Sequence, residues 1–185
     1  MRRRTQACPP ARDNGQVIKL LPNGAPILIR PIRADDKRLL QDGLRNLSER
    51  TVQRRFLSPK PSFSSAELRY LTEVDGRNHV ALVAEHARDP VRRLIGVARY
   101  VGLPEHPETA EAAIVVADEW QGRGVGSLLA EQLAARARGA GVRSFTATMA
   151  SDNVPAHRLM RRLTRHLDRR HAGAGVDELV LDLAA

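Results

Sequence analysis

The stretch that decides the fold is VVADEWQGRGVG, residues Val115–Gly126, followed at once by apolar residues at helical spacing. Its β-branched start suits a buried strand, and three glycines then stand where the strand becomes a helix. Glycine lets successive backbone N–H groups converge on one point without a Cβ in the way. The first turn of a helix adds partial positive charge there. The segment is therefore predicted to bind an anion.

The glycine spacing excludes two common nucleotide-binding motifs. A P-loop needs a Lys and then a Ser or Thr after its last glycine, whereas Ser127 follows Gly126 directly. A dinucleotide-binding turn needs the spacing G-x-G-x-x-G, which Gly122, Gly124 and Gly126 do not have. The segment does match the pattern Gln/Arg-x-x-Gly-x-Gly/Ala, filled by Gln121, Gly124 and Gly126.

This pattern resembles the acyl-CoA signature of the GNAT superfamily of N-acetyltransferases. Four further stretches look like the acetyltransferase domain of bacterial protein lysine acetyltransferases: RPIR at 30–33, RRFL at 54–57, LTEVD at 71–75 and VALV at 80–83. The resemblance implies an α+β GNAT fold, with a central mixed, mostly antiparallel sheet flanked by helices and an N-terminal β-hairpin. It also implies acetyl-CoA as the cosubstrate.

The rest of the chain agrees with one α+β domain. Apolar runs at 17–21 and 27–32 flank Pro22-Asn23-Gly24-Ala25, whose Asn-Gly pair predicts a β-hairpin. Residues 1–14 are expected to form a disordered basic tail, and residues 15–185 a single GNAT domain. Further strands are expected at 80–85, 94–101, 111–116, 142–149 and 176–183, and helices at 35–47, 49–57, 64–74, 126–139 and 153–163.

Composition narrows the function classes. No run approaches the roughly 18 apolar residues of a membrane helix, and the only cysteine, Cys8, excludes an internal disulfide, so we expect a cytoplasmic protein. The net charge of +9 comes from arginines spread along the chain with few aromatic residues to stack on bases, which argues against specific nucleic-acid binding. The six histidines show no metal-ligand spacing, so no metal is expected.

Acetyl transfer to an amine requires a base. A lysine with a pKa near 10.4 is neutral in only about one molecule in 2,500 at pH 7, equivalent to roughly 4.6 kcal/mol against attack. Glu111, in the strand before the glycine turn, is the candidate; the alternative is a surface carboxylate at a strand end. The resemblance favours the base, because Ala110–Val116 looks like the strand that places a glutamate near the incoming amine in bacterial lysine acetyltransferases.

The resemblance also assigns the coenzyme contacts. The backbone of Ile114, Val115 and Val116 is expected to hydrogen-bond the pantetheine arm, and the Val116 N–H to polarise the thioester carbonyl. Asp118 and Glu119 are expected to point away from the phosphates. The residues assigned to the diphosphate turn are Gln121, Gly122, Arg123, Gly124, Val125, Gly126 and Ser127.

The segment after the next strand departs from the family pattern. Asn153 is expected to cap a helix, and on resemblance it is equally a contact of the coenzyme. Met160 stands where many family members have a tyrosine that protonates the leaving thiolate, and a thioether has no proton to donate. Thr164-Arg165 replaces a usual Gly-aromatic pair. The general acid is therefore unassigned.

Three functions remain open. The first is transfer of acetyl from acetyl-CoA to a primary amine by direct attack, with a protein lysine favoured by resemblance. The second has a small amine as acceptor, such as a polyamine, an amino acid or an aminoglycoside, and the third is a non-catalytic acyl-CoA-binding regulatory module. Residues 45–63 and the link 103–109 are expected to line the acceptor side, and the chain is expected to be a monomer or a homodimer.

Overall fold

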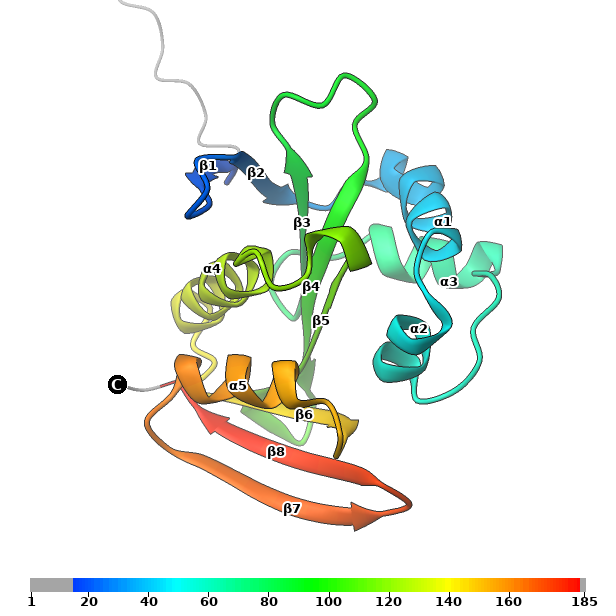
Figure 1. The fold of residues 1–185 in the computed structure, drawn as a ribbon. Helices are drawn as coiled ribbons and strands as arrows, with labels where there is room; N and C mark the ends of the chain where they lie inside the picture. The colour runs from blue at the N-terminus through cyan, green and yellow to red at the C-terminus, as the bar shows by residue number, and fades with distance from the viewer. Residues whose placement is uncertain (1–14, 184–185) are drawn as a thin grey trace, which may run out of the picture.

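The computed structural model describes residues 15–183, which form one eight-stranded sheet with helices on both faces (Figure 1). The strand order is β1-β2-β3-β4-β5-β6-β8-β7, and every neighbouring pair is antiparallel except β5 and β6. The strands are β1 (Val17–Leu20), β2 (Pro26–Pro31), β3 (His79–His86), β4 (Leu94–Leu103), β5 (His106–Val116), β6 (Ser144–Ala150), β7 (Leu167–Gly173) and β8 (Val176–Asp182). The mixed, mostly antiparallel sheet is confirmed.

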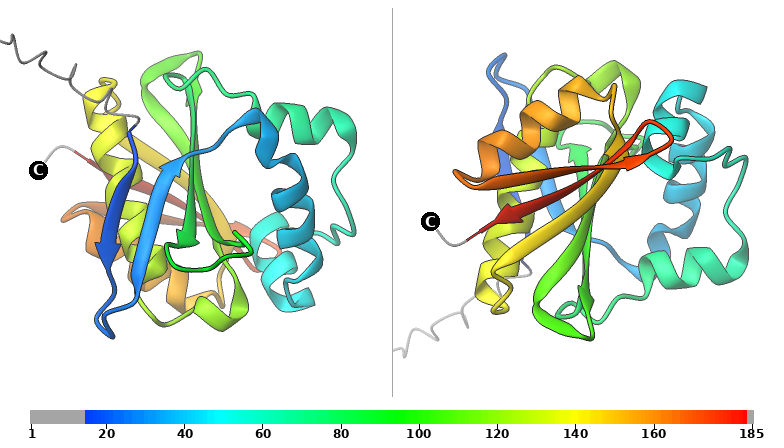
Figure 2. Two further views of the ribbon diagram at one scale, coloured as in Figure 1. Left: turned by 90° about the horizontal axis from the view of Figure 1, so that it is seen from above. Right: turned by 90° about the horizontal axis from the view of Figure 1, so that it is seen from below.

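The helices divide into two groups. Helices α1, α2 and α3 cover one face of the sheet, and α4 and α5 cover the other, as the two views along the sheet make plain (Figure 2). They span α1 (Lys37–Arg45), α2 (Glu49–Phe56), α3 (Ser65–Thr72), α4 (Val125–Gly139) and α5 (Val154–Leu163), with short 3-10 turns η1 (Ala34–Asp36) and η2 (Asp118–Trp120).

The main core lies between the sheet and α4. Val125, Leu129 and Leu133 recur at helical spacing on α4 and are at most 1% exposed, because they pack against apolar side chains of β3, β4 and β5. A smaller cluster on the other face joins Ile32, Leu40 and strand β3. Strands β4 and β5 are thus held between two packed layers.

Local sequence signals explain where these elements begin. In the β1–β2 turn the Ala25 N–H donates to Asn23 Oδ1 at 3.1 Å and Gly24 has φ +80°, which confirms the predicted hairpin. Helix α3 begins with a capping box, in which Ser64 N donates to Glu67 Oε2 at 2.8 Å and Glu67 N to Ser64 Oγ at 3.2 Å.

Two expectations about the strands were wrong. Strand β5 begins at His106 rather than at 111, so the link expected at 103–109 is a tight turn and the first part of β5. Strand β7 was not predicted at all, because LDRRHAG has almost no apolar alternation. It is an edge strand whose side chains are nearly all exposed, which is where charged residues are common.

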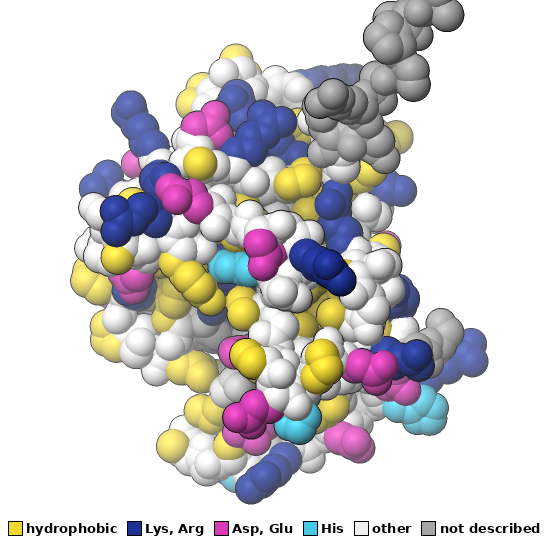
Figure 3. Space-filling model, turned by 180° about the vertical axis from the view of Figure 1, so that it is seen from behind, with side chains coloured by type: hydrophobic (Ala, Val, Ile, Leu, Met, Phe, Trp, Pro, Cys, Tyr) yellow, Lys and Arg dark blue, Asp and Glu magenta, His cyan; other side chains and the backbone are white. Residues whose placement is uncertain are grey.

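The surface agrees with a dispersed charge distribution. Viewed from behind, Lys and Arg side chains are interspersed with Asp and Glu rather than gathered in one block (Figure 3). No helix of residues 15–183 is both long and apolar enough to cross a bilayer. The tail expected at 1–14, including Cys8, lies outside the described residues.

Candidate functional site

The main-chain groups of β5 alternate between its two neighbours. On the β4 side, Ala117 N donates to Ile95 O at 2.9 Å just beyond the end of the strand. On the β6 side, Arg143 N donates to Glu108 O at 2.8 Å. In a strand, the N–H and C=O groups of one residue point to one neighbouring strand and those of the next residue point to the other. The main-chain groups of the even-numbered residues of β5 therefore point to the β6 side.

The second half of β5 has a free edge on this side. Pairing with β6 ends at Glu111, opposite Thr146, while β5 continues along β4 to Val116. The main-chain groups of Ile114 and Val116 therefore point to an edge without a strand partner among residues 15–183, whereas those of Val115 point to β4. An extended ligand chain can hydrogen-bond to such an edge as an added strand.

The glycine turn lies at the end of this edge. Gly122 and Gly124 have φ of +71° and +99°, a region that favours glycine, and Gly124 is the N-cap of α4. The next three N–H groups, of Val125, Gly126 and Ser127, open the helix and have no intrahelical acceptor. The turn therefore presents converging donors and the positive end of the helix dipole, as an anion site requires.

Gln121 is an exposed residue that ties the turn to neighbouring parts of the protein. Its side-chain amide donates to Val116 O at 3.0 Å and to Thr51 Oγ1 at 3.1 Å, and its N–H donates to Asp118 O at 3.2 Å. The main-chain N–H and the side-chain amide of Gln121 are thus engaged within the protein. The sequence predicted a contact with the diphosphate, but the structure shows Gln121 linking the end of β5 to α2.

Asp118 points away from the turn, as expected. Its carboxylate accepts hydrogen bonds from Ser48 N at 2.8 Å, Ser48 Oγ at 2.7 Å and Thr51 Oγ1 at 2.6 Å, at the start of α2. Burial acts to raise the pKa of Asp118, but the hydrogen bonds from Thr51 and Ser48 outweigh it and lower the pKa. Sequence reasoning missed this link, because the partners are 67 and 70 residues apart.

Arg123 and Glu119 both lie against Trp120. The Arg123 guanidinium is 5.4 Å from the centre of the indole ring, in a cation–π contact. The Glu119 carboxylate accepts from Trp120 Nε1 at 3.2 Å. The expectation that Glu119 is directed away from the N–H groups of the glycine turn is consistent with this contact.

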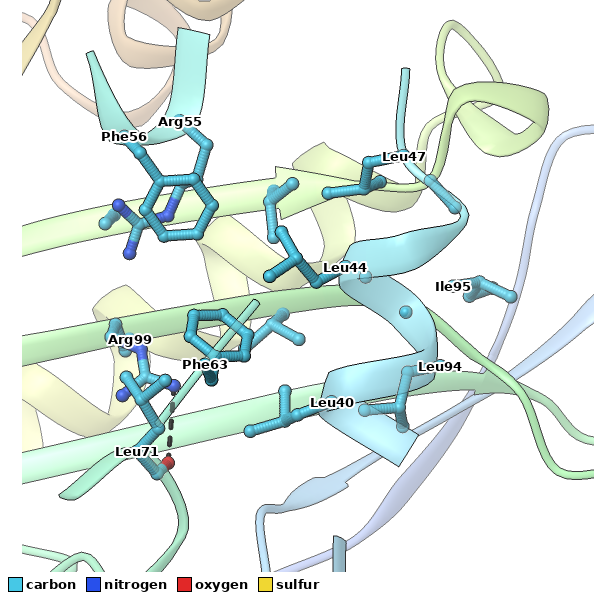
Figure 4. Close-up of a pocket in the computed structure, with 16 residues that line it drawn as sticks. Leu40, Leu44, Leu47, Arg55, Phe56, Phe63, Leu71, Leu94, Ile95 and Arg99 are labelled. Carbon is cyan, nitrogen blue, oxygen red and sulfur yellow. Dashed lines mark hydrogen bonds between the residues drawn. The ribbon is translucent and has the colours of Figure 1, made fainter. Parts of the chain in front are cut away.

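The face of β5 that is turned towards α1, α2 and α3 borders an apolar cavity of about 70 Å³ (Figure 4). Ala113 and Val115 line it, and Glu111 has the same parity along the strand, so its side chain projects to the same face. The only charged residues that line the cavity are Arg55 and Arg99. Of the regions expected on the acceptor side, 45–63 contributes to this lining and 103–109 does not.

The charged groups at this cavity influence one another. Burial lowers the pKa of Arg55, and the carboxylate of Glu111 acts in the opposite direction. Burial and repulsion from Arg55 lower the pKa of Arg99 to about 10. These couplings place Glu111, Arg55 and Arg99 in one electrostatic group next to the free edge of β5.

Helix α5 begins and ends as its sequence indicates. Asn153 Oδ1 accepts from Ala156 N at 3.4 Å, so the predicted cap is confirmed. Met160 is 5% exposed and packs in the core. Thr164 Oγ1 accepts from His166 N at 3.0 Å and donates to His166 O at 2.9 Å, which closes the turn that follows α5 without a glycine.

Within residues 15–183, no group of three or more His, Cys, Asp or Glu side chains is placed to hold a metal ion. The arrangement consists of a helix start without intrahelical acceptors for its first N–H groups, at the end of a strand with a free edge, and a carboxylate on the face of that strand that borders a cavity. This combination defines the class of acyl-CoA N-acyltransferases.

Comparison with known proteins identifies the family. The acetyltransferase (GNAT) family matches residues 46–164, and the chain belongs to this family. The predicted GNAT fold and membership of the acetyltransferase family are thereby confirmed.

Three relatives show how far the similarity extends. The chain is 37% identical over 136 residues to Acetyltransferase Pat of Mycolicibacterium smegmatis, covering 73% of this chain and 40% of that protein. It is 33% identical over 146 residues to Acetyltransferase PA5475 of Pseudomonas aeruginosa, covering 79% and 76%. The GNAT domain of S. lividans PAT superposes with a TM-score of 0.80 at 27% identity, covering 94% of this chain and 99% of that domain. The chain thus spans less than half of the M. smegmatis relative.

Proposed function

We propose that this acetyltransferase moves the acetyl group of acetyl-CoA to a primary amine, with a protein lysine as the favoured acceptor. The observation that supports it most directly is the free edge of β5 at Ile114 and Val116, which leads to the first turn of α4. The likeness of the chain to bacterial protein lysine acetyltransferases favours lysine over small amines.

The coenzyme contacts follow from the direction of the free N–H groups. We assign the diphosphate to the backbone of Gly122–Ser127, where Arg123 adds positive charge, and the pantetheine arm to Ile114 and Val116. Val115 contributes through its side chain, which lines the cavity, and Asn153 through capping α5. Gln121 acts indirectly, by holding Val116 O and the start of α2.

The reaction proceeds by direct attack of the amine. Glu111 accepts a proton from the amine, whose nitrogen then forms a bond to the thioester carbonyl carbon. The Val116 N–H donates to the oxygen on which negative charge develops. The carbon–sulfur bond breaks and the nitrogen releases its second proton to solvent as the amide forms. The thiolate takes a proton from solvent, because buried Met160 has none to give.

The variant Glu111→Gln tests the base. Loss of the carboxylate should lower kcat by about 10²- to 10⁴-fold with an amine acceptor, because the neutral amine is no longer generated in place. Acetyl-CoA affinity, measured by calorimetry, should stay close to that of the unmodified protein. Glu105→Gln is the matched control, since Glu105 is exposed in the β4–β5 turn, away from the cavity. Unchanged turnover in Glu111→Gln would remove the proposed role.

The acceptor is tested separately. We expect kcat/KM for a lysine-containing peptide to exceed that for a polyamine, an amino acid or an aminoglycoside at saturating acetyl-CoA. The reverse order would favour a small-amine acetyltransferase. Binding of acetyl-CoA without turnover of any amine would favour the regulatory module.

A further inference from the structure

We propose that the cavity next to Glu111 is a carboxylate-binding acyl pocket, which takes the short chain of a dicarboxylic acyl-CoA such as succinyl-CoA. The inference rests on the proposed acyl transfer and extends its donor beyond acetyl-CoA. Two arginines, Arg55 and Arg99, line the cavity.

The cavity has an apolar part and a cationic end. In Figure 4 the guanidinium groups of Arg55 and Arg99 lie toward one end, while Leu44, Leu47 and Leu94 lie toward the other. Methylene groups of a short chain can pack against the apolar lining, and a terminal carboxylate can reach the cationic end. A methyl group, which is all that an acetyl donor offers, makes no use of a guanidinium.

Arg99 is buried without a carboxylate partner among the described residues. It is 7% exposed, donates to Leu71 O at 3.3 Å and lies 3.2 Å from His79 Nε2. Within residues 15–183 neither Arg99 nor Arg55 forms an ion pair. Of the five guanidinium N–H groups of Arg99, most are therefore left for a ligand.

Another buried arginine, Arg30, is paired with carboxylates of the protein itself. Arg30 is 1% exposed, and its guanidinium donates to Asp36 Oδ2 at 2.7 Å and to the carboxylate of Glu85. In the part of the chain that the structure describes, Arg99 has no such partner, and Arg55 has only the charge of Glu111 beyond ion-pair distance, so both guanidinium groups gain from an incoming anion.

The position of the cavity favours the acyl chain as the source of this anion. Ala113 and Val115 line it, and they alternate along β5 with Ile114 and Val116, whose main-chain groups face the free edge. A thioester held at that edge therefore lies next to the cavity, and the small side chain of Ala113 leaves room beside the strand.

The proposed transfer needs no additional reagent. The amine nitrogen forms a bond to the thioester carbonyl carbon of succinyl-CoA while the carbon–sulfur bond breaks. Glu111 accepts one proton from the protonated amine, the nitrogen releases a second to solvent as the amide forms, and the leaving coenzyme A thiolate takes a proton from solvent. The product is an amide that retains the free carboxylate, and nothing is oxidised or reduced.

The experiment compares two donors of equal chain length. Succinyl-CoA and butyryl-CoA both have a four-carbon acyl group and differ in the terminal carboxylate, so the ratio of their kcat/KM values with one amine isolates its effect. We expect the unmodified protein to favour succinyl-CoA at least tenfold, and Arg99→Met and Arg55→Gln each to lower that ratio at least tenfold. Arg50→Gln, exposed on the same helix as Arg55, should leave the ratio unchanged.

Two results would overturn the pocket: a preference for butyryl-CoA, or a ratio that neither arginine variant changes. Arg55 is only partly buried, so its variant keeps the test decisive should Arg99→Met fail to fold. The acyl assignment would also be overturned if, with acetyl-CoA as donor, the protein prefers acceptors that bear a carboxylate, such as lysine over cadaverine, and Arg55→Gln abolishes that preference. The anion would then belong to the acceptor. If no acyl-CoA is turned over, the proposed function fails, and the relative affinities for succinyl-CoA and butyryl-CoA still decide the pocket.

Discussion

At the scale of single residues, glycines of the same motif serve different needs. Gly124 has φ +99° and is the N-cap of α4, so its need for glycine is conformational. Gly126 lies inside the helix, where an added Cβ would be 3.6 Å from Leu159 and 3.7 Å from Val116, which are ordinary contact distances. The alternation Gly-x-Gly/Ala in the sequence pattern follows from this difference.

Alanine substitutions should separate the two positions. Gly124→Ala should lower the free energy of unfolding by about 1 kcal/mol or more, because a side chain is strained at this φ. Gly126→Ala should be neutral or stabilise by up to about 1 kcal/mol, since alanine favours a helix and space is present. Urea denaturation measures both, and equal losses in the two variants would contradict this account.

Single residues also mark the limit of sequence reasoning at the site. The role of Glu111 was inferred from its place before the glycine turn, which is a local relation. The grouping of Glu111 with Arg55 and Arg99 was not, because those arginines come from α2 and β4 and meet only across the packed cavity. The chain has many arginines, and no local sequence pattern indicates which of them lack a carboxylate partner in the fold.

At the scale of elements, prediction succeeded where apolar periodicity or a cap was present. Helices α3 and α5 were expected from Ser64 and Asn153 at their starts, and both caps form. Strand β7 has no such signal. It pairs with β8 in an antiparallel hairpin, and its charged side chains contact that strand: Arg169 Nη2 lies 2.7 Å from Asp177 Oδ2 and His171 Nδ1 lies 3.1 Å from Asp177 Oδ1. A periodicity argument cannot detect a strand whose side chains are largely charged and nearly all exposed.

Asp177 should make this region sensitive to acid. Burial acts to raise the pKa of the Asp177 carboxyl, but hydrogen bonds from His171 and Ser151 and the charge of Arg169 hold it at about 2. Because this pKa is below that of an unfolded aspartate, about 3.9, the stabilisation is present above pH 4 and is lost as pH falls towards 2. The free energy of unfolding should therefore fall over this window.

The variant Asp177→Asn tests that assignment. It should be less stable than the unmodified protein at pH 6 and should show a flatter decline of unfolding free energy between pH 4 and pH 2, measured with urea at each pH. Asp168→Asn is the control, because Asp168 is exposed on β7. An unaltered pH slope in Asp177→Asn would assign the acid sensitivity to other carboxylates.

At the scale of the whole molecule, the site exists because β5 keeps one neighbour and loses the other. The sequence predicted the strand, the glycine turn and the helix, since these are contiguous. It did not predict that the pairing of β5 with β6 stops at Glu111. That end point depends on the course of β6, which is paired with β8 through seven residue pairs. Strand registers between distant segments are decided by packing of the complete sheet, and they create the free edge.

Acetyl-CoA should therefore stabilise the whole fold, since the proposed contacts join β5 to the start of α4. At a free concentration of 100 times Kd, the free energy of unfolding should rise by about 2.7 kcal/mol if only the native state binds. Urea unfolding with and without the ligand measures this. S-acetylpantetheine, which retains the arm but lacks the diphosphate, should stabilise the protein far less at the same concentration, because it leaves the N–H groups of Gly122–Ser127 without their anion. Equal stabilisation by the two compounds would show that the turn does not hold the diphosphate.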